Sequence, residues 1–143
     1  MSIDTIFKSA LAIAGAAAGY FFGEFDGFFY AIITFVVIDY ITGILSAIIK
    51  KQLSSGIGFK GIFRKVCIFI MIGIAHIIDT NVLKENGVLR TMVIFFYIAN
   101  EGISIIENAA FLGLPIPAKL VSSLLQLKKK YEDKENGQEN NKE

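Results

Sequence analysis

The sequence predicts an all-α integral membrane protein with three to four transmembrane helices, four being favoured. Of its 143 residues, 54% are hydrophobic, and the polar residues concentrate in short loops and near the C-terminus. A soluble domain of this size needs polar side chains over much of its surface, whereas a bilayer requires long apolar segments. We therefore expect a helical membrane domain over residues 1–127. Residues 128–143 are almost entirely polar and are expected to form a disordered cytoplasmic tail.

Four apolar stretches are candidates for spanning the bilayer, near residues 6–23, 28–49, 61–78 and 88–106. In the second stretch, thirteen Phe, Ile, Leu and Val residues outweigh the insertion cost of Asp39. The fourth contains Asn100 and Glu101 and is expected to need partners. The first has few large side chains, which leaves three alternatives open. It spans the bilayer, lies in the interface or is removed as a signal peptide. A short amphipathic helix is expected after the prolines that follow the fourth stretch.

The distribution of Lys and Arg predicts the orientation in the membrane. The loop between the second and third stretches contains no acid and several basic residues: Lys50, Lys51, Lys60, Arg64 and Lys65. Such loops face the cytoplasm, where anionic headgroups attract them. The loop before the second stretch is acidic, and lysines follow the fourth. Four spans therefore place both termini inside; three spans would place the N-terminus outside.

Polar residues in the second stretch gather on one side of the predicted helix. At about 100° per residue, one arc holds Asp39, Thr42, Gly43 and Ser46. In the first stretch, Gly15 and Gly19 have the small-xxx-small spacing that lets helices approach closely in lipid. We expect these six residues to make helix–helix contacts.

The fourth stretch carries a broader polar stripe on one face: Arg90, Tyr97, Asn100, Glu101, Ser104, Glu107 and Asn108. Lipid offers no hydrogen-bond partners, so such a face must meet polar protein or water. Two interpretations remain open. The stripe either pairs inside a bundle as structural contacts, or it lines an aqueous path or subunit contact in a homo-oligomer.

The residues predict neither catalysis nor a cofactor. No phosphate-binding glycine motif is present, and the net charge of +1 gives no indication of a nucleic-acid partner. His76 and Asp79 are expected to make a local hydrogen bond rather than a metal site. A Ser/His/Asp set would have to come from different segments without a nucleophile-elbow motif, so an enzyme is not expected.

Several short motifs occur together in the middle of the chain. They are DYITG at 39–43, the spacing Ser55-x-x-Gly58-x-x-Gly61-x-x-Arg64-Lys65, the spacing Glu101-x-x-Ser104-x-x-Glu107-Asn108, and GLPIP followed by Leu120. Through these motifs and their order, residues 38–120 resemble the phage-lysis and toxin-secretion holin family. The resemblance implies a small multi-pass protein of the bacterial cytoplasmic membrane that forms homo-oligomers and needs no cofactor. Its lesions would release a cell-wall endolysin or a large toxin, without direct contact to that cargo being required.

Two other classes are compatible with the residues themselves. A small four-helix ion- or proton-coupled transporter would use Asp39 or Glu101 as its coupling carboxylate, and would show pH-dependent flux without killing cells. A non-enzymatic membrane adaptor subunit would copurify with a larger partner. The family motifs, rather than the polar faces, favour the holin interpretation over the transporter.

Overall fold

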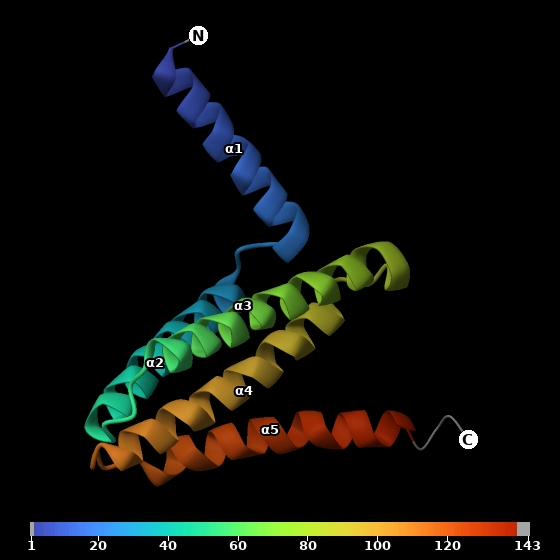
Figure 1. Ribbon diagram of the computed structural model, residues 1–143. Helices are drawn as coiled ribbons and strands as arrows, with labels where there is room; N and C mark the ends of the chain where they lie inside the picture. Colours follow the sequence, from blue (N-terminus) through green and yellow to red (C-terminus); the bar gives the residue numbers. More distant parts are fainter. Residues whose placement is uncertain (1, 140–143) are drawn as a thin grey trace.

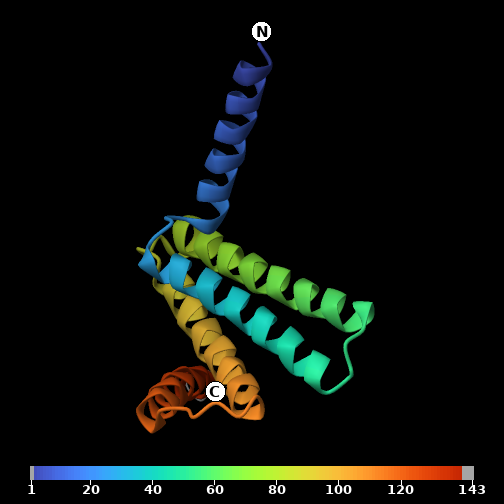
Figure 2. The ribbon, with the colours of Figure 1, turned by 90° about the vertical axis from the view of Figure 1, so that its left-hand side faces the viewer.

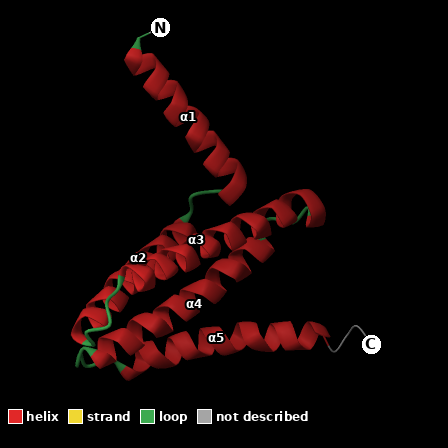
Figure 3. Cartoon of the chain, in the orientation of Figure 1, coloured by secondary structure: helices red, strands yellow, loops and turns green. Residues whose placement is uncertain are grey.

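A computed structural model describes the backbone of residues 2–139 and the side chains of residues 2–130. Within these residues the chain is helical with short connections and has no strand (Figure 3). This confirms the all-α prediction. The elements are α1 (Ile3–Phe22), α2 (Gly27–Ile49), α3 (Ser55–Ile78), the short π-helix η1 (Asp79–Leu83), α4 (Val88–Phe111) and α5 (Ala118–Glu139).

Side-chain caps encoded in the sequence begin the first three helices. The oxygens of Ser2, Asp26 and Ser54 accept hydrogen bonds from backbone N–H groups three residues later, at 3.3, 2.9 and 3.3 Å. Such caps satisfy N–H groups that have no partner within the helix. The cap at Ser54 starts α3 six residues before the expected boundary at 61, so part of the predicted basic loop is helical.

Helices α2, α3 and α4 form the bundle, and its core is aliphatic. Ile32, Ile72 and Ile94, one from each helix, are fully buried. Figures 1 and 2 show these three helices lying side by side. Among the described residues, four helical segments are long and apolar enough to cross a membrane: α1, α2, α3 continued by η1, and α4. This agrees with the four predicted spans.

Helix α1 leaves the bundle instead of packing along it. It has no buried residue, and in Figures 1 and 2 it projects away from the end where it joins α2. Its contacts lie at its C-terminal end, where the Phe22 ring meets the Phe69 ring of α3 at 6.4 Å between centroids. Apart from the neighbouring residues and backbone of α1 itself, no atom of the described residues lies within 4 Å of a Cβ built on Gly15 or Gly19. Within the described part of the chain, their predicted helix contacts are therefore not made.

Helix α5 turns back along α4 after the Pro115–Pro117 turn (Figure 1). Leu124 is its buried hydrophobic residue among the described side chains. The helix is longer than expected: it continues through residue 128, where the sequence predicts the start of a disordered tail, to Glu139. Lys and Glu are good helix formers and no proline interrupts this stretch, which explains the extension. Residues 140–143 of the predicted tail lie outside the described part.

Candidate functional site

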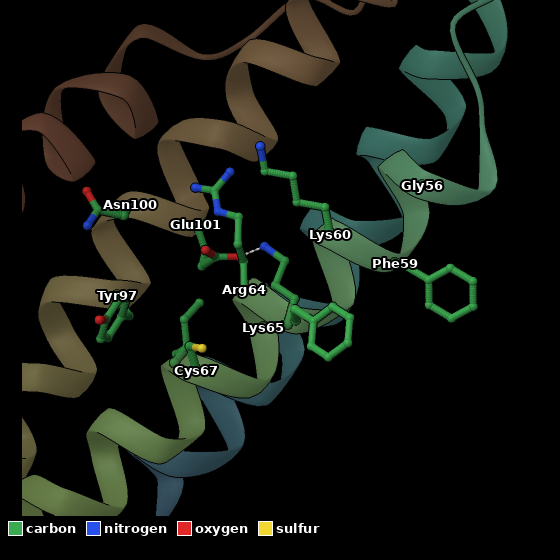
Figure 4. A pocket seen from close by; sticks show the side chains of 11 residues that line it. Gly56, Phe59, Lys60, Arg64, Lys65, Cys67, Tyr97, Asn100 and Glu101 are labelled. Atoms are coloured by element: carbon green, nitrogen blue, oxygen red, sulfur yellow. Dashed lines mark hydrogen bonds and ion pairs between the residues drawn. The ribbon is translucent and has the colours of Figure 1, made fainter.

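One lysine of α3 joins the other two bundle helices at the centre of the polar faces. The Lys65 ammonium contacts the carboxylates of Asp39 on α2 and Glu101 on α4. The three side chains are 16%, 12% and 11% exposed, so the contact is largely withdrawn from the surface. Figure 4 shows Lys65 directed at Glu101. We call these three residues the charge cluster.

A second polar layer holds the Asp39 carboxylate from α4. The Asn108 Nδ2 group donates to Asp39 Oδ1 at 3.4 Å and to Thr42 Oγ1 at 3.2 Å. The Thr42 hydroxyl in turn donates to the Asp39 carbonyl at 3.1 Å. Because Asn108 follows Glu101 by two helical turns, both lie on one side of α4. The polar faces predicted for α2 and α4 therefore meet each other here.

The charge cluster has one cation between two carboxylates. Buried ion pairs add little net stability over apolar packing, but removing one partner leaves an uncompensated charge and is costly. The arrangement connects α2, α3 and α4 through a single cation. Paired in this way, Asp39 and Glu101 are accommodated in segments that are otherwise apolar enough for lipid.

Lys65 points in a different direction from the one expected for the basic loop, toward the bundle instead of the headgroups. It belongs to α3 and turns toward α2 and α4, because successive helical residues point about 100° apart. The other basic residues, Lys50, Lys51, Lys60 and Arg64, are exposed. Lys50 stacks over the Phe111 ring at 4.2 Å from its centroid.

Arg90 is separated from the rest of the predicted stripe and forms its own site at the opposite end of the bundle. Its Nε donates to the Phe22 carbonyl at 2.7 Å, its Nη2 to the Glu24 carbonyl at 2.6 Å, and its Nη1 to Asp26 Oδ2 at 2.9 Å. The side chain is 6% exposed. We call Arg90 and these acceptors the outer clasp. It connects the α1–α2 loop to the start of α4.

Asp26 and Asp79 complete the outer clasp, and the sequence reasoning did not assign them to Arg90. Burial alone would raise the pKa of Asp26, but hydrogen bonds from the Phe29 N–H and from Arg90, with the Arg90 charge, hold the pKa below its ordinary value of 3.8. Asp79 accepts from the backbone N–H groups of Leu89 and Arg90 at 3.0 and 2.7 Å. The expected local bond between Asp79 and His76 is replaced by this cap on α4.

The remaining polar residues predicted for the stripe are less buried than Glu101. Tyr97, Asn100 and Ser104 are half-buried, and Glu107 is exposed. The Oγ of Ser46 is buried and has no hydrogen-bond partner among the described residues.

Two hollows adjoin the charge cluster. One, of about 250 Å³, is lined by Asp39, Gly43, Asn100, Glu101 and Ser104 among others. The other, of about 820 Å³, lies between α3 and α4. In the described part of the chain, no group of three His, Cys, Asp or Glu side chains is arranged to hold a metal ion.

Comparisons with known proteins identify a family and several relatives of this sequence. The model of the bacteriophage holin family matches residues 16–129. An uncharacterized protein of Listeria innocua is 41% identical over 93% of this chain and 94% of its own. An uncharacterized protein of Clostridium perfringens is 38% identical over 90% and 98%. A probable holin of Bacillus phage phi105 is 40% identical over 76% and 78%. No solved structure matches.

The family match covers α2 to α4 completely, but it includes only residues 16–22 of α1. It therefore includes the charge cluster, the outer clasp and the polar stripe of α4. Together with the four apolar helices, it identifies a multi-pass protein of the cytoplasmic membrane. The chain belongs to the bacteriophage holin family.

Proposed function

We propose that copies of this chain associate in the bacterial cytoplasmic membrane and open lesions that release a cell-wall endolysin or a large toxin. Membership of the holin family and the likeness to a probable holin of phage phi105 support this role. The proposal contains no catalytic step and no cofactor. The cargo need only pass through the opening, so direct contact with it is not required.

The observation that carries the proposal is the charge cluster with its incompletely satisfied surroundings. Asp39, Lys65 and Glu101 adjoin open hollows, Ser46 has an unpaired hydroxyl among the described residues, and Glu107 is exposed. Lipid cannot hydrogen-bond to the exposed Glu107 or to the groups that line the hollows, whereas water in a shared opening can. Association that turns such faces toward one opening is therefore favourable.

The lining we propose is the polar side of α4: Tyr97, Asn100, Glu101, Ser104, Glu107 and Asn108. In a single copy, Glu101 is paired with Lys65, and Asn108 is bonded to α2. A lining role requires these contacts to rearrange when copies assemble. We therefore interpret the arrangement described above as the closed form of the protein.

Induced expression in a bacterial host tests the proposal. Culture density, entry of a membrane-impermeant dye and release of a co-expressed cytoplasmic endolysin are followed together. Abrupt dye entry with enzyme release is the expected result, because only a protein-sized opening passes both. Dye entry without enzyme release would indicate small pores. Unharmed growth with the protein in the membrane would favour a transporter or an adaptor.

The lining is tested separately with a pair of substitutions. Glu101→Leu combined with Glu107→Leu should change the time of lysis, because both carboxylates are assigned to the opening. The matched control is Glu24→Leu combined with Glu85→Leu, which removes two exposed carboxylates outside the membrane-spanning part. Unchanged timing in the first pair would contradict the lining, even where lysis itself occurs.

A further inference from the structure

We propose that the hollow between α3 and α4 binds the phosphate of an anionic phospholipid from the cytoplasmic leaflet. Lys60 and Arg64 are its phosphate-binding residues. The inference requires membrane insertion but not lesion formation, so it stands apart from the proposed function.

The hollow is an open groove beside the first turns of α3. It measures about 820 Å³ and is lined by residues of both helices, among them Lys60, Arg64, Tyr97 and Asn100. Figure 2 shows α3 and α4 farther apart toward the end where α3 begins. In Figure 4, the long side chains of Lys60, Arg64 and Lys65 extend from α3 toward α4.

The charges lining the groove do not balance. Lys60, Arg64 and Lys65 oppose the single carboxylate of Glu101, and Lys65 is already committed to Glu101 and Asp39. Lys60 and Arg64 are exposed, and neither forms an ion pair within the described residues. Two positive charges therefore remain without an anion at the mouth of the groove.

A phosphate diester has the chemistry to occupy this position. The Arg guanidinium binds phosphate oxygens in a two-pronged fashion, and the Lys ammonium adds a point charge. Lys60 and Arg64 are four residues apart on α3, so their side chains lie one above the other on the same face. A zwitterionic headgroup brings its own cation, which these two charges repel. The site therefore favours a lipid with net negative charge.

The depth of the two residues agrees with a headgroup. Helix α3 with η1 has 29 residues, or about 43 Å at 1.5 Å per residue, against a hydrocarbon core of about 30 Å. The start of α3 therefore reaches past the hydrocarbon, and the long side chains of Lys60 and Arg64, within the next two to three turns, extend back toward the headgroups. Below them, Phe63, Cys67 and Ile68 continue the groove as an apolar wall for an acyl chain.

Copurified lipid provides the test. The full chain is extracted in mild detergent and incubated with phosphatidylglycerol or phosphatidylcholine, and retained lipid is quantified by native mass spectrometry. Lys60→Gln with Arg64→Gln should lower phosphatidylglycerol retention by about 25-fold, since each of the two basic side chains near a headgroup is worth about fivefold. The control, Lys51→Gln with Lys119→Gln, removes two exposed charges from the same membrane side and should retain the lipid.

The alternative outcomes each overturn the proposal. Equal losses in the two double variants would mean diffuse attraction to basic residues. Equal retention of phosphatidylcholine would remove the charge argument, and displacement by millimolar inorganic phosphate would indicate a site for the free anion. If the first double variant fails to fold, Lys60→Gln and Arg64→Gln are measured singly; unchanged retention in both would likewise exclude the site.

Discussion

Lys65 is the residue whose loss should matter most to the bundle. Its ammonium is the cation that separates Asp39 from Glu101. Lys65→Met would leave two carboxylates near each other in a medium of low dielectric constant. We expect the free energy of unfolding to fall by about 3–5 kcal/mol, seen as a lower thermal midpoint in detergent. Lys51→Met, at an exposed position, should change it by less than about 0.5 kcal/mol.

A combined substitution separates charge from packing at the same place. Asp39→Asn, Lys65→Met and Glu101→Gln together remove every charge of the cluster while keeping side-chain size. Because no uncompensated charge remains, this triple variant should be more stable than Lys65→Met alone. A triple variant as unstable as the single one would show that the instability of Lys65→Met does not come from its uncompensated carboxylates.

Arg90 acts through the shape of its guanidinium. Three of its N–H groups reach separate acceptors: the carbonyls of Phe22 and Glu24 and the carboxylate of Asp26. Lysine keeps the charge but not the fork, so Arg90→Lys should leave acceptors unpaired at a cost of about 1–3 kcal/mol. Faster protease cleavage in the α1–α2 loop would report the loss. Arg64→Lys, at an exposed arginine, is the control and should cleave like the parent.

The pH dependence of the outer clasp follows from Asp26. Its pKa in the folded chain lies below the ordinary 3.8, so folding favours the charged form. The stabilisation is complete above 3.8 and is lost as the pH falls through the lowered pKa. The thermal midpoints of the parent and of Asp26→Asn should therefore differ by a constant amount from pH 8 to pH 5 and converge in more acidic solution. A gap that closes already between pH 7 and pH 5 would contradict this assignment.

At the scale of the element, helical periodicity predicted which residues share a face, but not how each helix is turned. It placed Asp39 with Thr42 on one face of α2 and Glu101 with Asn108 on one face of α4. These two faces meet, since Asn108 bonds to both Asp39 and Thr42. Lys65, at the start of the predicted stretch 61–78, was expected to face headgroups with the basic loop, but its side chain turns to Asp39 and Glu101. Its rotation toward the carboxylates depends on packing between helices, which no single segment encodes.

The contact between α4 and α5 depends on the absence of a side chain at Gly102. A Cβ there would lie 2.9 Å from the Leu124 methyl groups and 3.0 Å from the Phe35 ring. Gly102→Ala should therefore displace Leu124 and loosen α5, seen as faster amide hydrogen exchange in α5. Gly43→Ala is the matched control, since the nearest atom to its Cβ is 3.8 Å away. Equal exchange in both variants would mean that α5 is held elsewhere.

At the scale of the whole molecule, the number of candidate spans was predictable and the long-range clasps were not. Apolar length alone indicates four helices that can cross a membrane. By contrast, Arg90 lies 64 residues from Asp26 in the chain, and their pairing requires the α1–α2 loop and the start of α4 to meet. The sequence offered one signal: an acidic outer loop without a basic residue of its own.

Whether α1 crosses the membrane decides between four spans and three. Its 20 residues have the hydropathy of a span, yet none is buried against this chain. If lipid or another copy surrounds it across the bilayer, four spans place Ser2 in the cytoplasm. In a Cys67→Ser background, a membrane-impermeant maleimide added to intact cells should label Glu24→Cys but neither Ser2→Cys nor Lys51→Cys, and permeabilised cells should show labelling of all three. Labelling of Ser2→Cys in intact cells would instead establish three spans with α1 outside, and the assembly would then use α2, α3 and α4 alone to cross the membrane.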